Sequence, residues 1–274
     1  MSLYTIFGGR GFIGSEFVRQ LTKLGHDIYI PERNDANIYK KDLGTVIYAA
    51  GYGDCENNAV NVLEANTVLL NRILNNSQFQ KIVYISSTRV YMGGNSTSEE
   101  SNLIINFKDK RKLFNLTKLT SEEMCIKSGK ECLIIRPSNV YGLALNSPLF
   151  LPSIIRDAIN DQVVNMYVTP HYSKDYVHVG DVVSSTISLI NKSQNGIFNI
   201  ASGKNTNADS IANLLINKTG CKVNWLVEND IDFFSPIDIS KIKSITDFYP
   251  SSVLDDINSM VQKFKISMAK KSVI

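Results

Sequence analysis

Three glycines near the N-terminus have the spacing of a loop that binds phosphate groups. Gly8, Gly11 and Gly14 follow the apolar run Leu3-Tyr4-Thr5-Ile6 and form a G-x-x-G-x-x-G pattern. The first glycine permits a tight turn after a strand, the second lets the backbone approach a pyrophosphate, and the third lets helix and sheet pack closely. The order strand, glycine loop and helix predicts a dinucleotide-binding site.

The helix that follows these glycines would present its N-terminus to the bound anion. Apolar residues recur at helical spacing from Phe12 and Ile13 to Leu24. The first N–H groups of such a helix point toward the loop and favour negative charge. We therefore expect Phe12 and Ile13, together with the glycines, to contact the cofactor.

Charged residues after the next strand indicate which dinucleotide is bound. Glu32 and Arg33 follow a predicted strand at 26–30, where a Rossmann unit places the residue that reads the ribose. Glu32 could bind both ribose hydroxyls of NAD, whereas Arg33 could pair with the 2′-phosphate of NADP. Arg10 adds a second cation from the glycine loop. Two arginines against one carboxylate favour NADP, with NAD as the second choice.

The chain between Ile30 and the next buried strand, at 45–51, is short. About fourteen residues are too few for a full helix and a further strand with their connections. We therefore expect those elements to be short or missing, which leaves the adenine pocket more open. The strand at 45–51 ends in the small residues Ala49, Ala50 and Gly51, which would let the cofactor lie against it.

Apolar strands alternate with amphipathic helices along most of the chain. This alternation predicts an α/β fold, a Rossmann doubly wound parallel sheet with a smaller mixed C-terminal lobe. We assign residues 1–142, with return segments near 175–200, to the dinucleotide-binding domain, and 143–274 mainly to a substrate-binding lobe. The predicted helices are 11–24, 58–74, 110–128, 152–160, 182–190, 208–218 and 253–264, and the predicted strands are 2–7, 26–30, 45–51, 81–86, 132–135, 163–167 and 197–200.

Composition excludes several other classes of protein. The 274 residues are 43% hydrophobic and 20% charged, with a net charge of +3 and no basic block long enough to suggest nucleic-acid binding. No apolar run is long enough to span a membrane, and we expect no signal peptide. The four cysteines lack the spacing of metal ligands, so we expect no metal site and a cytoplasmic protein with reduced thiols.

Six motifs, taken in order, resemble the extended short-chain dehydrogenases/reductases, of the NAD(P)-dependent epimerase/dehydratase kind that acts on nucleotide sugars. The resemblance runs over nearly the whole chain. It implies a cytoplasmic, homodimeric enzyme of polysaccharide biosynthesis, which acts on a nucleotide-linked sugar and binds neither nucleic acid nor membrane. The motifs are Gly8 to Gly14, Asn66 within a helix, Ile85 to Tyr91, Arg136 to Gly142 including Pro137, Asp175 to Asp181, and Gly196 to Ile200.

Catalysis in this family uses a Ser or Thr, a Tyr, and a Lys four residues after the Tyr. The tyrosine exchanges a proton with the sugar oxygen, while the lysine holds the nicotinamide ribose and lowers the pKa of the phenol. By resemblance, Ser87 takes the serine role and Lys118 the lysine role, and Asn66 and Pro137 lie at the cofactor. The tyrosine position is held by Phe114, which has no proton to exchange.

Three explanations of Phe114 remain open. The residue could be an introduced Tyr→Phe substitution of an active enzyme. Alternatively, the natural enzyme uses another acid, such as Ser87, Thr88 or a substrate-bound water. In the third explanation the protein has lost catalysis and kept cofactor binding, which makes it a regulatory or cofactor-binding protein on the same fold.

Two further departures from the family pattern concern the reaction type and the residue at the diphosphate. Dehydratases carry an Asp-Glu pair after the serine or threonine, whereas Thr88 and Arg89 stand there, so we expect a reductase or epimerase of a 4-keto or hydroxy sugar. By resemblance, Ser87, Thr88, Arg89 and Asn139 contact the substrate. Lys174 stands where many relatives place an arginine on the diphosphate.

Overall fold

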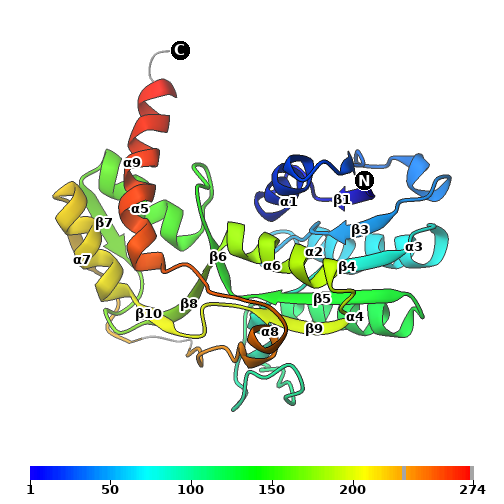
Figure 1. The fold of residues 1–274 in the computed structure, drawn as a ribbon. Helices are drawn as coiled ribbons and strands as arrows, with labels where there is room; N and C mark the ends of the chain where they lie inside the picture. Colours follow the sequence, from blue (N-terminus) through cyan, green and yellow to red (C-terminus); the bar gives the residue numbers. More distant parts are fainter. Residues whose placement is uncertain (230–232, 272–274) are drawn as a thin grey trace. The chain divides into compact units, whose positions relative to one another are not determined.

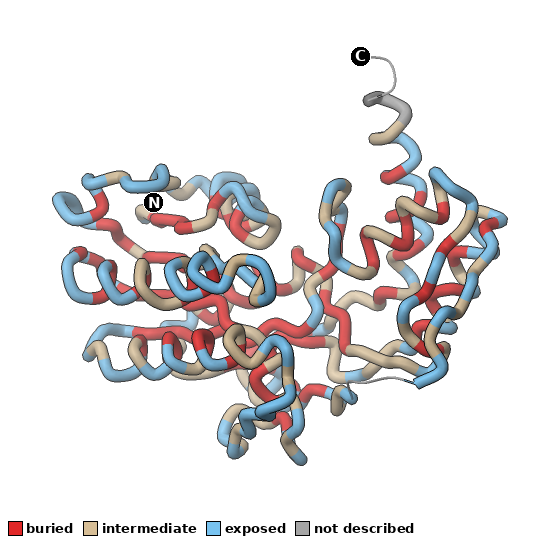
Figure 2. The backbone as a smooth tube through the Cα atoms, turned by 180° about the vertical axis from the view of Figure 1, so that it is seen from behind, coloured by how far each residue is buried: buried red, intermediate tan, exposed pale blue. Residues whose placement is uncertain are grey.

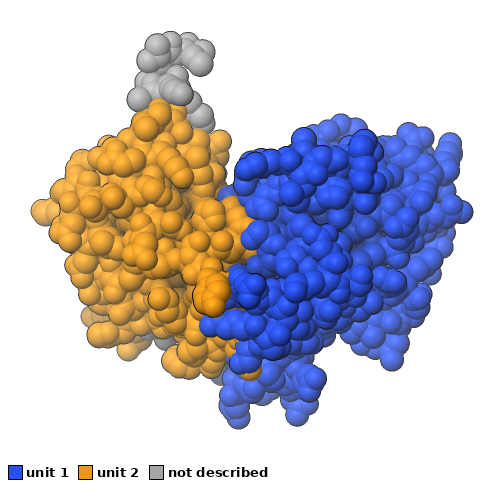
Figure 3. Space-filling view, in the orientation of Figure 1, with its two compact units in different colours: residues 1–137, 183–200, 240–248 blue, residues 138–182, 201–239, 249–274 orange. Residues whose placement is uncertain are grey.

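The protein divides into two compact units in the computed structural model, which describes residues 1–229 and 233–271 (Figure 1). The first unit comprises residues 1–137, 183–200 and 240–248, and the second comprises 138–182, 201–239 and 249–274 (Figure 3). The chain therefore leaves the first unit after strand β5 and returns to it twice.

The first unit is built on one parallel sheet, which confirms the predicted doubly wound α/β fold. Its six strands lie in the order β2-β1-β3-β4-β5-β9, and every neighbouring pair is parallel. Reversal of strand order beside β1 puts the carboxyl ends of β1 and β3 at the switch point where such sheets bind ligands. The strands are β1 (Leu3–Phe7), β2 (Asp27–Tyr29), β3 (Thr45–Tyr48), β4 (Lys81–Ile85), β5 (Glu131–Pro137) and β9 (Gly196–Ile200).

The connection between β2 and β3 is as short as the sequence predicts. It contains a single 3-10 turn, Ala36–Tyr39, and no further strand, so β2 forms the edge of the sheet. Asp35 caps this turn, because its carboxylate accepts a hydrogen bond of 2.9 Å from the N–H of Asn37. The usual additional helix and strand are thus missing.

Helices connect the strands of the first unit. The helix predicted at 58–74 is interrupted by a π-helical turn, Glu64–Val68, between α2 and α3. Such turns place an extra residue in one helical turn and are frequent at functional sites. The helices are α1 (Phe12–Lys23), α2 (Ala59–Leu63), α3 (Leu69–Asn76), α4 (Lys112–Lys127), α6 (Val179–Asn191, which begins in the second unit) and α8 (Ser240–Ile245).

One cluster of the core of the first unit lies between the sheet and helices α3 and α4, and helices α1 and α6 bury apolar side chains as well. Strands β1, β3, β4 and β5 are buried almost throughout their length, whereas the edge strand β2 has no buried residue (Figure 2). Leu70 and Ile73 of α3 and Cys125 of α4 pack into the same cluster as Tyr48 and Tyr84 of the sheet. Each large aliphatic side chain buried in this way contributes about 1.5–3 kcal/mol, which stabilises the packing of α3 on the sheet.

The second unit is a mixed α/β assembly with two small sheets. One has the order β10-β8-β6 and contains an antiparallel and a parallel pair, and the other pairs β11 with β7. Its core includes Ile154 of α5, Leu215 of α7 and Phe264 of α9. The elements are β6 (Asn139–Tyr141), α5 (Phe150–Asn160), β7 (Val163–Met166), β8 (Ser173–His178), β10 (Asn205–Asn207), α7 (Ala208–Thr219), β11 (Lys222–Trp225) and α9 (Val253–Lys271).

The sequence predictions missed several short elements and misplaced three boundaries by three residues or more, one of them the end of β3, which lies at Tyr48 rather than at residue 51. Strands β6, β10 and β11 and helix α8 have no more than six residues each, too few for a periodic pattern. Helix α6 begins three residues earlier than predicted, and α9 continues to Lys271 rather than ending at residue 264. Of the helices within residues 1–229 and 233–271, none is both long and apolar enough to cross a membrane.

Candidate active site

The glycine loop brings α1 against the end of β1 at distances that no other residue allows. Gly8 has a φ of +78°, and a Cβ atom there would lie 2.7 Å from the backbone of Ala49. A Cβ on Gly14 would lie 2.0 Å from the carbonyl oxygen of Gly8. Gly11 is the N-cap of α1, so the N–H groups of Phe12 and Ile13 belong to the first turn, which has no acceptors within the helix. The loop forms a cradle for an anion.

The charges at the ends of β1 and β2 interact with one another. Arg10 Nη1 donates a hydrogen bond of 3.1 Å to Glu32 Oε2, and Nη2 contacts Oε1. Both side chains are exposed, at 63% for Arg10 and 71% for Glu32. Arg33 is exposed beside them. The three residues predicted to read the ribose therefore lie together, at the end of β2 and in the glycine loop.

Small residues after β3 lie beside the glycine loop and α4. Ala49 contacts Gly8, as the distance above shows, and Ala50 follows it. A Cβ on Gly51 would lie 3.3 Å from Lys118 Nζ and 3.4 Å from Asn66 Oδ1. The end of β3 therefore connects the glycine loop to Lys118, the predicted catalytic lysine.

Lys118 is a buried amine with little to stabilise its charge. Its side chain comes from the middle of α4, the residue is 5% exposed, and Nζ donates a hydrogen bond of 2.8 Å to the carbonyl oxygen of Ile85. Burial lowers the pKa of Lys118 to about 8, while Glu122 one turn later acts in the opposite direction. The aromatic rings of Tyr84 and Phe114 lie 5.0 Å and 5.6 Å from Nζ. An amine of this pKa can hold or release a proton near neutral pH.

Phe114 lies between two cationic side chains of its own helix. The guanidinium carbon of Arg111 is 4.9 Å from the ring centroid, and Lys118 approaches as described. A Cβ on Gly53 would lie 3.4 Å from Arg111 Nη2 and 4.0 Å from Phe114 Cε2. The ring therefore packs beside the segment that follows β3, on the same side of α4 as Lys118, and its place in catalysis stays a prediction.

Asn66 fixes the turn after β3. Its Oδ1 accepts a hydrogen bond of 2.9 Å from the N–H of Tyr52, and its Nδ2 donates to the carbonyl oxygen of Tyr52 at 3.1 Å and to Thr117 Oγ1 at 3.0 Å. The residue is fully buried within the π-helical turn. Asn66 thus joins the turn to α4 at the residue preceding Lys118; direct contact of Asn66 with a cofactor stays a prediction.

The segment after β4 carries Ser87, Thr88 and Arg89 on a short 3-10 helix, Thr88–Tyr91. Ser87 is its N-cap, and Ser87 Oγ accepts a hydrogen bond of 3.2 Å from the N–H of Arg89. The hydroxyl hydrogen of Ser87 is not used in this bond. Thr88 is buried, at 9% exposure. Ser87 therefore has a fixed position and a proton to donate.

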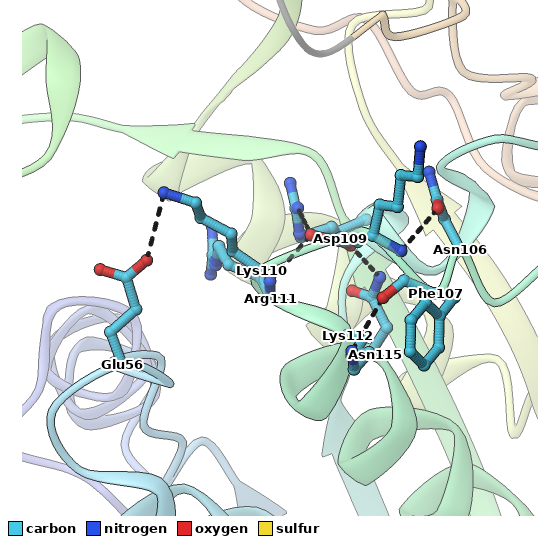
Figure 4. A network of polar contacts seen from close by, with 10 residues as sticks. Glu56, Asn106, Phe107, Asp109, Lys110, Arg111, Lys112 and Asn115 are labelled. Carbon is cyan, nitrogen blue, oxygen red and sulfur yellow. Dashed lines mark hydrogen bonds and ion pairs between the residues drawn. The ribbon is translucent and has the colours of Figure 1, made fainter.

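Arg89 forms an ion pair that the sequence analysis did not predict. Its Nη2 donates to Asp109 Oδ1 at 2.8 Å, and the two side chains are 11% and 5% exposed. Asp109 also accepts hydrogen bonds from the N–H of Arg111 at 2.8 Å and from Asn115 Nδ2 at 3.0 Å (Figure 4). Asp109 therefore fixes the start of α4 relative to the end of β4. The sequence indicates that the charge of Arg89 needs a partner, but it does not identify Asp109 as the residue that provides the carboxylate.

A buried polar network lies one turn further along α4. Glu122 accepts hydrogen bonds from Arg136 Nε at 3.0 Å and Nη2 at 2.5 Å, and it also contacts the hydroxyl of Ser86. Arg136 Nη1 donates to Tyr91 Oη at 2.7 Å, and that hydroxyl donates to Asn199 at 2.8 Å. The neighbouring Pro137 is the last residue of β5 and pairs with β9. This network ties α4 to β4, β5 and β9.

Two of the predicted substrate residues belong to the second unit. Asn139 begins β6, and its Nδ2 donates a hydrogen bond of 2.8 Å to the carbonyl oxygen of Asp175. Lys174 lies on β8 with Nζ 4.9 Å from the ring centroid of Tyr172 and 4.8 Å from that of Phe234. These aromatic contacts help to fix the position of the amine on β8, the central strand of its sheet. Among the described residues, no cluster of His, Cys, Asp or Glu could hold a metal ion.

Comparisons with known proteins identify the family and agree with the fold. The profile of the NAD dependent epimerase/dehydratase family matches residues 4–201. A dTDP-4-dehydro-6-deoxy-D-allose reductase from Streptomyces sp is 19% identical over 311 residues, covering 95% of either chain. MoeE5 in complex with UDP-glucuronic acid and NAD has a TM-score of 0.84 at 19% identity, covering 97% of this chain and 99% of that one. RMD from Pseudomonas aeruginosa complexed with NADPH has a TM-score of 0.80 at 18% identity, covering 97% and 100%.

Proposed function

Because this chain belongs to the NAD-dependent epimerase/dehydratase family, we propose that it is an NAD(P)-dependent reductase or epimerase of a nucleotide-linked sugar. The observation that carries the proposal is the position of Lys118, which touches the end of β3 next to the glycine cradle. The reductase relative acts on a 4-dehydro sugar linked to dTDP by its name, and the MoeE5 structure holds a UDP-sugar. We propose a 4-keto or hydroxy sugar as the substrate.

The residues at the carboxyl ends of β1 and β3 fit a dinucleotide. Gly8 and Gly14 allow the tight packing of the loop, because a Cβ at either position would collide with backbone, and Gly11 lets a pyrophosphate approach the backbone. The amides of Phe12 and Ile13 supply hydrogen-bond donors. Lys118 would hold the nicotinamide ribose. When bound, the nicotinamide supplies or accepts a hydride, and the protein must supply the matching proton.

We propose NADP as the preferred cofactor and NAD as the second choice. Glu32, the carboxylate that would bind the ribose diol of NAD, is engaged by Arg10. A 2′-phosphate carries more charge than Glu32 and could displace it from Arg10, with Arg33 as the second partner. Both cofactors occur among the relatives of known structure, since the MoeE5 structure holds NAD and the RMD structure holds NADPH.

The side chains after Ser87 support reduction or epimerisation rather than dehydration. Thr88 and Arg89 supply no carboxylic acid, and the guanidinium of Arg89 binds Asp109. Elimination of water needs an acid at the leaving hydroxyl and a base at the adjacent carbon. We propose that Ser87 and Thr88 of the first unit contact the sugar. For Asn139 and Lys174 of the second unit we propose the part in substrate binding that the family resemblance implies.

Incubation with nucleotide sugars tests the proposal directly. Purified protein and its Phe114→Tyr variant are mixed with NADPH or NADH and a panel of dTDP- and UDP-linked 4-keto sugars, and separately with hydroxy sugars and NAD(P)⁺. Oxidation of the cofactor is followed at 340 nm, and epimers are resolved by chromatography. We expect turnover of at least one sugar by one of the two proteins. No turnover by either protein, with cofactor binding confirmed by titration, would contradict the proposal.

A second candidate function follows from Phe114 itself. A chain that binds NADP but cannot transfer the proton would be a regulatory or cofactor-binding protein. It predicts that NADP(H) binds and that Phe114→Tyr has no effect on turnover. Full activity of the Phe114→Tyr variant, with none in the parent, would instead indicate a Tyr-to-Phe form of an active enzyme.

We further propose that the protein is a cytoplasmic homodimer. Apolar side chains are exposed on two neighbouring helices, namely Val60 and Leu63 on α2 and Leu116 on α4, at 81%, 47% and 43%. Burial of such residues against the same face of a second copy would be favourable. The four cysteines are free, as expected in a reducing compartment. Light scattering tests the assembly, and Leu116→Glu should yield monomers.

A further inference from the structure

The connection between β4 and α4 ends in a segment, residues 102–112, that exposes large apolar side chains. Residues 102–106 lie in neither a helix nor a strand, and Figure 1 shows this connection as a loop that extends beyond the sheet of the first unit. Ile104, Ile105 and Phe107 are 48%, 40% and 83% exposed. Three large apolar side chains within four positions are costly to leave in water, which indicates that this segment meets another surface.

The same segment is strongly basic. It contains one acid, Asp109, and four cations, Lys108, Lys110, Arg111 and Lys112. The chain has 29 Lys and Arg residues against 26 Asp and Glu, so this segment alone accounts for the net charge of +3, and the remaining residues are balanced. The carboxylate of Asp109 is 5% exposed and paired with Arg89. The exposed charge of the segment is therefore positive.

Contacts within the segment place cations beside the apolar side chains. Lys112 Nζ donates a hydrogen bond of 2.8 Å to the carbonyl oxygen of Phe107 and lies 4.4 Å from the centroid of its ring (Figure 4). Lys110 forms an ion pair of 3.9 Å with Glu56, but these two side chains are 84% and 66% exposed. An exposed pair of this kind exchanges partners at little cost, so Lys110 can meet another anion.

The size and charge of this surface favour a lipid membrane over a folded protein as its partner. The three apolar side chains expose on the order of 300 Å², whereas each partner of a stable protein complex buries about 800 Å². A lipid surface requires no complementary shape, and it binds segments that combine apolar side chains with Lys and Arg. Anionic headgroups attract such cations within a Debye length of the surface.

We propose that residues 102–112 dock the protein on an anionic lipid membrane. Ile104, Ile105 and Phe107 enter the headgroup region, and the neighbouring cations meet the lipid phosphates. Contact of this kind needs no membrane-spanning helix. The proposal departs from the sequence-based expectation of no membrane partner, and it does not depend on the reaction that the protein catalyses.

Sedimentation with vesicles tests the docking. The protein is mixed with vesicles of phosphatidylcholine, alone or with about 30% phosphatidylglycerol, in about 0.1 M NaCl, and the bound fraction gives a partition coefficient. The coefficient should be at least about tenfold higher for the anionic vesicles, and it should fall in about 0.5 M NaCl because salt screens the cations. Phe107→Ser should lower it at least about fivefold, and Lys108→Gln/Lys110→Gln at least about tenfold.

Matched controls change similar side chains elsewhere in the chain. Tyr249→Ser removes an aromatic residue that is 86% exposed, and Lys23→Gln/Lys127→Gln removes two exposed lysines. Both variants should bind vesicles like the parent. The proposal fails if the parent does not bind anionic vesicles, or if the controls lose as much binding as the variants of the segment. It also fails if the parent ignores vesicles but self-associates and becomes monomeric in Phe107→Ser, since the segment would then meet a second copy of the chain.

Fluorescence shows which surface meets the lipid. The parent has one tryptophan, Trp225, whose emission is recorded first and subtracted. The emission of Phe107→Trp should move to shorter wavelengths when anionic vesicles are added, because the indole leaves water. Tyr249→Trp is the control and should keep its emission. Vesicles that bind the protein without moving the emission of Phe107→Trp would place the contact on another surface and refute the proposal.

Discussion

Two arginine–glutamate pairs in the same unit have the same chemistry and opposite surroundings. Arg136 and Glu122 form two hydrogen bonds in the core, with side chains 3% and 4% exposed. Arg10 and Glu32 also form two, but their side chains are 63% and 71% exposed. A buried pair cannot lose one member without leaving a charge in a medium of low polarity, whereas an exposed pair exchanges its partner for water or a ligand at little cost.

Lys118 is buried like the first pair but lacks a carboxylate partner for its charge. It is as buried as Arg136, yet it has a single carbonyl acceptor where Arg136 has a carboxylate and a phenol. Burial alone would lower the pKa of Arg136, but Glu122 and Tyr91 raise it. The pKa of Lys118 falls to about 8. Arg136 is thus a fully paired buried charge and Lys118 an incompletely paired one, which is the kind of group that we propose for chemistry.

Breaking the buried pair should produce the largest effect on stability. Glu122→Ala leaves Arg136 buried without its carboxylate and should lower the free energy of unfolding by about 3–5 kcal/mol. Urea denaturation followed by circular dichroism measures this. Glu123→Ala is the matched control, since Glu123 is an exposed neighbour paired with Lys127, and it should change stability by less than about 1 kcal/mol.

The double variant Glu122→Leu/Arg136→Met sharpens this test. Apolar residues of similar size remove both charges, so much of the lost stability should return. A double variant as unstable as Glu122→Ala would show that the bonds to Ser86 and Tyr91, rather than an unpaired charge, account for the loss.

Lys118→Met should raise the free energy of unfolding at neutral pH, which is the opposite of the effect expected for Glu122→Ala. Below pH 8 both the folded and the unfolded chain carry the ammonium, and the folded chain bears the cost of burying it. Between about pH 8 and 10.5 the folded chain loses this proton first, so the unfolded chain binds more protons and stability rises with pH, by about 3 kcal/mol for this group.

Denaturation of the parent and of Lys118→Met at pH 7 and pH 10 isolates this contribution. The variant should be the more stable protein at pH 7, and the gap should close toward pH 10. Lys127→Met, on the exposed side of the same helix, should follow the parent at both pH values. Equal gaps at the two pH values would mean that the lysine is charged throughout, and cofactor binding should weaken in Lys118→Met in either case.

The same distinction explains how much of the fold the sequence predicts. The glycine spacing, the short connection after β2 and the alternation of strands and helices are local patterns, and the structure confirms the parallel sheet they predict. Lys118 also follows from a local motif. Asp109 does not, because its role depends on Arg89, which is distant from it in the chain.

Short elements escaped prediction for a related reason. Strands β6 and β10 have three residues each, and their pairing with β8 comes from tertiary contacts rather than from periodicity. The ion pair with Asp109 also bears on the prediction that Arg89 contacts the substrate. A guanidinium with a buried carboxylate partner is less available to a ligand. Its contact with a substrate stays a prediction.

The exposed pair should give the smallest change in stability and a clear change in cofactor preference. Glu32→Gln should alter the free energy of unfolding by less than about 1 kcal/mol, because water replaces the lost partner of Arg10. The variant frees Arg10 for a 2′-phosphate and weakens the grip on the ribose diol of NAD. The ratio of NADH to NADPH dissociation constants, measured by fluorescence titration, should therefore rise about tenfold, which corresponds to 1.4 kcal/mol. Arg10→Ala should move the ratio in the opposite direction, and a ratio unchanged in both variants would place the ribose away from this pair.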